Sequence, residues 1–165
     1  MKNIDELVAD KIYSIINYVL AKVIKPDIKI ENVRKLDEKM ILKLKQEYGI
    51  EGMILDVDDT LRKNMNNIPQ CNQEWIEKIK GQLKIIIVSN GKDPSIKKFL
   101  EERGIDYIDF ACKPLKKNFI KACEKMNVDA EKVLVVGDSL FDDIYGGKRN
   151  KMKTVLVKEV EDEER

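Results

Sequence analysis

Short apolar runs rich in Ile and Val alternate with segments of helical periodicity from about residue 50 onwards. Strands this apolar have no polar face for water, and they belong to parallel sheets that helices cover on both sides. Right-handed crossovers place the carboxyl ends of such strands at one edge. We predict strands at 52–57, 83–88, 106–110, 132–136 and 154–157, and helices at 72–81, 94–103, 115–127 and 140–149. The pattern therefore predicts an α/β fold with a central parallel sheet.

Two further helices are expected ahead of this alternation. Apolar residues recur at three- and four-residue spacing over 4–24, which predicts an amphipathic helix that Pro26 ends. Its apolar stripe either packs on the domain or a partner subunit, or rests on a membrane surface. A second helix is expected over 38–48. We divide the chain into an N-terminal helical extension (1–49), an α/β core (50–158) and a charged tail (159–165).

Composition restricts the chemistry open to the chain. Histidine is absent, which excludes Ser-His-Asp and Cys-His nucleophile systems and histidine-ligated metal sites. The 31 Lys and Arg residues balance 30 Asp and Glu residues, so the net charge of +1 gives no reason to expect nucleic acid as a partner. Carboxylates, lysines and hydroxyls remain, and Mg²⁺ is the cofactor that suits oxygen ligands of this kind.

The cysteines and the N-terminus favour a cytoplasmic protein. Cys71, Cys112 and Cys123 are odd in number and lack the close pairing of a zinc or redox motif, which favours buried thiols in a reducing compartment. Acidic residues interrupt the apolar pattern at the N-terminus, which argues against a secretory signal. No apolar run approaches the roughly 20 residues that span a bilayer.

Polar residues follow four of the predicted strands. They are Asp56 and Asp58 after the first, Ser89 and Asn90 after the second, Lys113 after the third, and Asp138, Asp142 and Asp143 after the fourth. One carboxylate at a strand end can attack phosphorus, and a second one two residues on can move the proton. Hydroxyl, amide and lysine groups suit phosphate oxygens. Each signal is weak alone, but their order and shared edge predict a site for phosphate chemistry.

Two other readings of the first motif can be tested on the sequence. A calcium-binding EF-hand loop starting at Asp56 requires Gly at its sixth position and Glu at its twelfth, where this chain has Leu61 and Asn67. A receiver-type phosphoacceptor switch also uses an Asp, a Ser or Thr and a Lys on successive strand ends, but its acidic pair precedes the acceptor. Here the additional acidic cluster follows Lys113.

With four motifs in this order, residues 50–157 resemble the haloacid dehalogenase superfamily of aspartyl phosphatases. Pro26-Asp27, the Tyr48–Gly52 entry, Ala-Cys-Lys-Pro at 111–114 and the Gly-Asp-Ser segment at 137–147 are similar to its YqeG-like, phosphatidylglycerophosphatase-type subfamily, subfamily IIIA. The resemblance implies a three-layer Rossmann-like fold and a Mg²⁺-dependent phosphomonoesterase that acts through an aspartyl-phosphate.

The resemblance also implies residue roles. Asp56 would be the nucleophile and Asp58 the general acid and then the base, while Lys113 would neutralise charge. On the substrate side, Thr60 would hold the turn of the motif, and Ser89 and Asn90 would hold phosphate oxygens. The implied Mg²⁺ ligands are Asp56, the main-chain carbonyl of Asp58, and Asp138. Asp143 is counted with this metal site, where it would orient a metal-bound water or the lysine.

The chain departs from the subfamily pattern at three positions. Asp59, Ser139 and Asp142 stand where Asn, Gln and Thr are usual. The catalytic positions survive, but the departures leave open whether Asp142 or Asp143 serves the metal.

The spacing between motifs leaves no room for a cap domain, so we expect an open site and a large phosphorylated substrate. The first helix and the basic run at 148–153 favour a lipid such as phosphatidylglycerophosphate, with peripheral contact at the inner face of the membrane. Taken alone, the basic run is also typical of a solvated loop. A soluble-metabolite phosphatase of the same superfamily, a non-catalytic phosphate-binding or scaffold protein, and a receiver-like switch remain as alternatives. Neither the physiological substrate nor the oligomeric state follows from the sequence.

Overall fold

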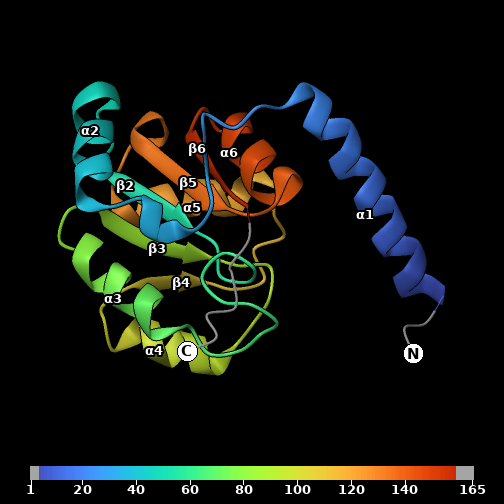
Figure 1. Cartoon of the computed structure of the whole chain (residues 1–165), viewed down its shortest axis with the longest axis horizontal. Helices are drawn as coiled ribbons and strands as arrows, with labels where there is room; N and C mark the ends of the chain where they lie inside the picture. The colour runs from blue at the N-terminus through green and yellow to red at the C-terminus, as the bar shows by residue number, and fades with distance from the viewer. Residues whose placement is uncertain (1–3, 159–165) are drawn as a thin grey trace.

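The structure, a computed structural model, describes residues 4–158 and has a six-stranded parallel sheet at its centre (Figure 1). The strand order is β1-β6-β5-β2-β3-β4, and every hydrogen-bonded pair is parallel. The strands are β1 (Ile28–Ile30), β2 (Gly52–Leu55), β3 (Lys84–Val88), β4 (Asp106–Ile108), β5 (Val133–Gly137) and β6 (Lys153–Val157). The predicted tail at 159–165 lies outside the described residues.

Helices connect the strands. They are α1 (Ile4–Val23), α2 (Glu38–Tyr48), α3 (Gln70–Ile79), α4 (Pro94–Glu101), α5 (Lys116–Met126) and α6 (Gly146–Arg149), with 3₁₀ turns η1 (Val33–Lys35) and η2 (Ala130–Lys132) and a π-helical segment η3 (Leu140–Tyr145). Side-chain caps begin α2 and α4, because Asp37 accepts a hydrogen bond from the Met40 N–H and Asp93 from the Ser95 N–H. Helix α2 ends at Gly49, whose φ of 65° is left-handed.

Alternate strand residues feed two cores, one on each face of the sheet. On one face, Met53 and Leu55 of β2 belong to a cluster with side chains of α2, α3 and α4. On the other face, Ile54 belongs to a cluster with Phe119 and Met126 of α5. Both faces of the parallel sheet are therefore buried, as the apolar strands predicted. This confirms the predicted α/β fold.

The structure adds two features that the sequence analysis lacks. Residues 1–49 were expected to contribute helices alone, but β1 lies in this segment and pairs with β6 at the sheet edge. A three-residue strand is too short to show a period. The helix expected over 140–149 consists of the wide π-helical segment η3 and the single turn α6. Its bonding pattern depends on what η3 packs against, which the local sequence does not encode.

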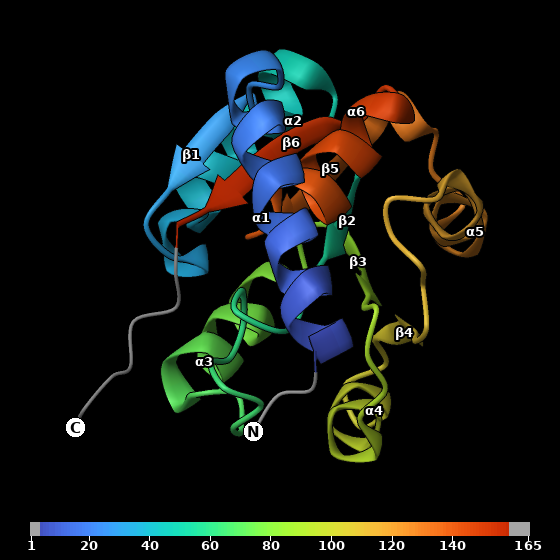
Figure 2. The same cartoon turned by 90° about the vertical axis from the view of Figure 1, so that its right-hand side faces the viewer.

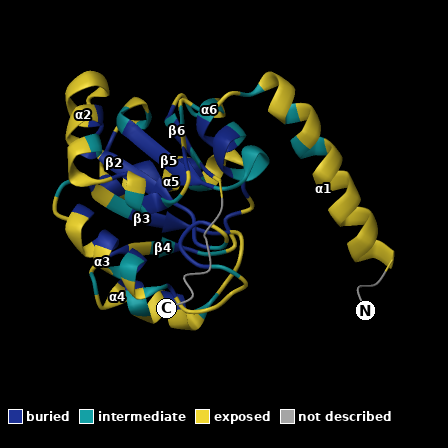
Figure 3. Ribbon diagram, viewed as in Figure 1, coloured by how far each residue is buried: buried dark blue, intermediate teal, exposed yellow. Residues whose placement is uncertain are grey.

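Helix α1 lies outside the two-faced core (Figures 1 and 2). Figure 3 shows it almost entirely exposed, and none of its residues is buried. Most of its apolar stripe does not pack on the domain, since Ile4, Leu7, Val8, Ile12, Ile15, Val19 and Val23 are all more than half exposed. Packing of the stripe on a partner subunit stays a prediction. Within the described part of the chain, no helix is long and apolar enough to cross a membrane.

Candidate active site

A pocket of about 250 Å³ opens at the carboxyl edge of the sheet, where the loops after β2, β3, β4 and β5 meet. Its lining includes nearly every residue that the sequence analysis singled out: Asp56, Asp58, Ser89, Asn90, Lys113, Asp138, Asp142 and Asp143. The edge is set by topology, because parallel strands all end on the same side. The predicted convergence of these side chains therefore occurs in the structure.

Lys113 lies at the centre of the site between two carboxylates. Its Nζ is 2.6 Å from Asp56 Oδ1 and 2.6 Å from Asp143 Oδ1, and all three side chains are at most a tenth exposed. Asp143 fits because residue 137 is a glycine, since a Cβ at Gly137 would overlap the Asp143 carboxyl group. Because the Lys113 ammonium group bonds both carboxylates, it fixes the orientation of Asp56 relative to Asp143.

A third carboxylate completes an acidic cluster. Oxygen atoms of Asp56, Asp138 and Asp143 all lie within 4.8 Å of one another. Thr60 Oγ1 is buried between two of them, 3.4 Å from Asp56 Oδ2 and 3.4 Å from Asp138 Oδ1. Thr60 was expected to hold the turn of the first motif, and its hydroxyl also contacts the acidic cluster. Three converging carboxylates form a donor set that fits a hard divalent cation.

Asp58 lines the same pocket but is not part of this cluster. Its Oδ1 accepts a hydrogen bond from Arg62 Nε at 2.8 Å, and Arg62 Nη1 also bonds Asp93 Oδ2 at 2.6 Å. Arg62 is buried, and the sequence analysis did not single it out. A basic residue four positions after Asp58 was the available signal. Arg62 ties the first motif to the N-terminus of α4.

The Ser89-Asn90-Gly91 turn forms the wall beside Lys113. Ser89 is buried, and its Oγ accepts a hydrogen bond from the Gly91 N–H at 3.1 Å. Asn90 Oδ1 accepts from the Lys113 N–H at 2.7 Å. The Asn90 side chain therefore positions the lysine backbone, a contact that the sequence analysis did not anticipate.

Burial and crowding shift the ionisation of the acidic cluster. Burial, together with the neighbouring Asp143, raises the pKa of Asp56 to about 6 in spite of Lys113. Burial and the charges of Asp143 and Asp56 raise the pKa of Asp138 to about 7. Burial also raises the pKa of Asp143. Desolvation alone would lower the pKa of Lys113, but Asp143 and Asp56 raise it above its usual range, so the lysine stays charged.

These shifts predict that the metal-free protein loses stability as pH rises. The pKa of Asp138 is raised on folding to about 7, so its contribution is full at low pH and disappears as pH passes through that value. We expect the wild type in chelator to be about 2 to 3 kcal/mol less stable at about pH 8 than at about pH 5, measured by urea unfolding.

Asp138→Asn is the matched variant, because it cannot titrate. Its stability should change less with pH than that of the wild type, and Mg²⁺ should restore stability to the wild type at about pH 8 by binding the ionised carboxylates. Equal pH dependence in variant and wild type would contradict this assignment.

Tyr13 of α1 also lines the pocket, although it is far away in sequence. Its Oη is 2.6 Å from Ser139 Oγ and donates to Asp142 Oδ2 at 3.0 Å. Asp142 is thereby turned towards α1, and the acidic cluster contains Asp143 in its place. Burial raises the pKa of Tyr13 to about 12, which keeps the phenol protonated. No local sequence signal could have shown a contact across this separation.

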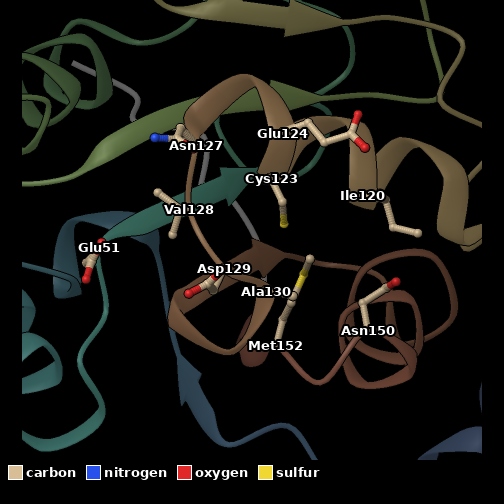
Figure 4. Close-up of a pocket in the computed structure, with 10 residues that line it drawn as sticks. All are labelled: Glu51, Ile120, Cys123, Glu124, Asn127, Val128, Asp129, Ala130, Asn150 and Met152. Carbon is tan, nitrogen blue, oxygen red and sulfur yellow. The ribbon is translucent and has the colours of Figure 1, made fainter.

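A second, larger cavity of about 510 Å³ lies at the opposite edge, before the start of β2 and β5 (Figure 4). Figure 4 shows Cys123 and Met152 pointing into it, with Glu51 and Glu124 at separate ends. The carboxylates do not converge there. The chemically equipped site is therefore the smaller pocket at the carboxyl edge.

Comparisons with known proteins identify the family of the chain. Residues 68–150 match the family described as haloacid dehalogenase-like hydrolase. The chain is 36% identical over 142 residues to the probable phosphatase YqeG of Bacillus subtilis (strain 168), covering 84% of this chain and 80% of that protein. A shorter match, 47% identical over 60 residues, links 36% of the chain to 25% of a glyceraldehyde 3-phosphate phosphatase of Pyrococcus abyssi (strain GE5 / Orsay).

A solved structure has the same fold. It is a haloacid dehalogenase-family enzyme of Bacteroides thetaiotaomicron in complex with magnesium and inorganic phosphate. The two share a TM-score of 0.57 at 12% identity, over 70% of this chain and 98% of that one. Fold, family match and extended identity lead to one conclusion: the chain belongs to the haloacid dehalogenase-like hydrolases, and within them to the YqeG-like phosphatases.

Proposed function

We propose that the protein is a Mg²⁺-dependent phosphomonoesterase that acts through an aspartyl-phosphate on Asp56. The observation that carries this proposal is the buried Asp56 carboxylate, held by Lys113 at 2.6 Å inside a cluster of three carboxylates at the sheet edge. A nucleophile needs a fixed orientation and compensation of charge before it meets an anionic phosphate. Lys113 supplies both.

The donor set supports Mg²⁺ as the cofactor. Asp56, Asp138 and Asp143 offer converging oxygens, and the main-chain carbonyl of Asp58 is the fourth ligand that the family resemblance implies. When bound, Mg²⁺ would neutralise charge shared by the carboxylates and the phosphate oxygens. That the related Bacteroides enzyme was solved with magnesium and phosphate supports the same assignment.

The chemistry proceeds by two displacements at phosphorus. Asp56 forms a bond to phosphorus, the bond to the leaving oxygen breaks, and Asp58 donates the proton that makes an alcohol. Water then attacks the same phosphorus, Asp58 accepts its proton, and Asp56 is released with inorganic phosphate. In this scheme Ser89 and the Asn90 amide hold phosphate oxygens, while Arg62 keeps Asp58 on the side where the leaving group departs.

We propose a phosphorylated lipid, of the phosphatidylglycerophosphate kind, as the substrate. No domain covers the pocket within residues 4–158, because the segment between β2 and β3 contains a loop and α3, and the segment between β3 and β4 contains α4. The exposed apolar stripe of α1 supports peripheral contact with a membrane. Lys11 and Lys22 belong to the same helix, and long lysine side chains can extend to lipid head groups while the aliphatic side chains enter the membrane. A cytoplasmic location is part of the same proposal. Of the three cysteines that were expected to be buried, only Cys123 is buried, whereas Cys71 is partly buried and Cys112 is exposed.

The basic run at 148–153 supports this proposal less than its sequence suggests. Lys148 Nζ lies 2.6 Å from Asp27 Oδ2 and Lys151 Nζ lies 3.9 Å from Glu131 Oε1. Arg149 lies over the Tyr145 ring, and Met152 is buried. The lipid proposal therefore rests on α1 and on the open pocket.

A panel of phosphomonoesters with and without Mg²⁺ tests the function. We expect chelator to abolish phosphate release, and we expect phosphatidylglycerophosphate in anionic vesicles to be hydrolysed faster than sugar phosphates or nucleotides. Faster release from glyceraldehyde 3-phosphate would favour the soluble-metabolite alternative that the Pyrococcus match suggests. No hydrolysis of any compound would favour a phosphate-binding protein.

The role of α1 has its own matched control within that panel. Ile15 lies in the exposed apolar stripe, whereas the neighbouring Ser14 lies outside it. Ile15→Glu should abolish co-sedimentation with anionic vesicles and lower lipid hydrolysis, while Ser14→Glu should leave both near wild type. Equal behaviour of the two variants would contradict membrane contact through this stripe.

A further inference from the structure

Helix α1 reaches the active-site pocket through one side chain, Tyr13. The ring packs edge-on against Phe141 with centroids 6.3 Å apart, and the hydroxyl lies between Ser139 and Asp142 at the start of η3. Figure 2 shows α1 passing in front of the sheet. Every residue of α1 before Ile16 is exposed, including those that flank Tyr13 in the chain. Tyr13 itself is 40% exposed.

The three polar groups at this contact close a ring of hydrogen bonds. The Asp142 N–H donates to Ser139 Oγ at 3.0 Å, and the Tyr13 hydroxyl donates to Asp142 Oδ2 at 3.0 Å. A carboxylate only accepts and a hydroxyl carries one proton, so Ser139 must donate to Tyr13 Oη at 2.6 Å. Both hydroxyls in the ring therefore donate and accept. Networks of this kind hold their members more tightly than isolated bonds do.

From this ring a short path leads to the nucleophile. The Ser139 N–H donates to Asp143 Oδ2 at 3.2 Å, and the Ser139 carbonyl accepts from the Asp143 N–H at 3.1 Å. Asp143 Oδ1 in turn accepts from Lys113, which also bonds Asp56. Ser139 thus fixes the Asp143 side chain, and Tyr13 fixes Ser139.

We propose that Tyr13 is a positioning residue, which holds the Ser139–Asp142 turn and thereby orients Asp143 and the acidic cluster from outside the α/β core. The proposal rests on the proposed Mg²⁺-dependent function. Ser139 and Asp142 are two of the positions where this chain departs from the subfamily motif. Tyr13 bonds both of them, so the contact belongs to this chain's own version of the site.

Tyr13→Phe is the direct test, and Tyr18→Phe is its matched control. Phenylalanine keeps the ring against Phe141 and removes the hydroxyl alone. Tyr18 lies on the same helix, is 64% exposed and is absent from the pocket lining. With p-nitrophenyl phosphate, Tyr13→Phe should lower kcat about tenfold, the scale of one hydrogen bond to a charged group, and leave KM within about twofold. Tyr18→Phe should match wild type.

Calorimetric titration with Mg²⁺ alone supplies a readout that does not depend on turnover. We expect the Mg²⁺ dissociation constant to rise about tenfold in Tyr13→Phe, as for other residues that orient metal ligands, and to stay unchanged in Tyr18→Phe. Ser139→Ala should give the same loss, and the double variant should lose no more than either single variant. Wild-type kcat and Mg²⁺ affinity in Tyr13→Phe would overturn the proposal. A wild type that binds Mg²⁺ but lacks turnover would overturn the proposed function alone.

Discussion

Asp56→Asn should abolish turnover, with a loss of about 10⁴-fold or more in kcat, because the amide cannot attack phosphorus and no phosphoenzyme forms. The substitution is nearly isosteric, and it replaces a buried group whose pKa is already raised to about 6. Folding should therefore survive. The measurements are phosphate release, acid-quenched trapping of the phosphoenzyme, and urea unfolding of the same preparation.

Asp129→Asn is the matched control for this variant. Asp129 is exposed and precedes β5, at the edge opposite the active site. The Asp129→Asn variant makes the same chemical change as Asp56→Asn and should leave kcat unchanged. Turnover by Asp56→Asn near the wild-type rate would exclude the mechanism given above, and a stable phosphoenzyme that never hydrolyses in the wild type would favour a receiver-like switch.

Lys113→Met should cost both activity and stability. The ammonium lies between Asp56 and Asp143, with all three groups buried, so its loss leaves two adjacent carboxylates without a cation. Removal of one partner from a buried ion pair costs roughly 3 to 5 kcal/mol. We expect destabilisation of that size at about pH 8, partial recovery near pH 5 as the carboxylates take up protons, and a loss of about 10³-fold in kcat.

Lys125→Met gives the comparison at the surface. Lys125 pairs with Asp106 at 3.4 Å, and both side chains are more than 40% exposed. An exposed pair contributes little, so this variant should change stability by less than about 1 kcal/mol at either pH. If Lys113→Met were equally harmless at about pH 8, the central role of this lysine would be wrong.

The sequence predicts the sheet and the residues at its carboxyl edge for a common reason. Parallel strands buried on both faces read as continuous apolar runs, and topology alone brings their ends together. Asp56, Ser89, Lys113 and Asp138 could be assigned to one pocket without knowledge of any packing. The chemical roles of these four residues are tested by the variants described above.

Long-range contacts explain what the sequence could not predict. The partners of Tyr13 lie more than a hundred residues away, and β1 becomes a strand only beside β6. Arg62 bonds Asp93, and both α3 and β3 lie between them in the chain. The direction of the α1 stripe also depends on tertiary contact, because Tyr13 bonds the residues of η3 and leaves the aliphatic side outward. Periodicity describes a helix face but not its neighbour.

The pairing of β1 with β6 also orders events during synthesis. Ile28 finds its sheet partner, Val155, only after nearly all of the described chain has left the ribosome. Until then β1 has no edge to join, and the segment that carries Tyr13 stays unanchored. Contacts of such large sequence separation form late, after local helices and neighbouring strand pairs. A nascent chain would thus assemble the β2, β3 and β4 strands early and gain its complete catalytic site in one of the last steps of folding.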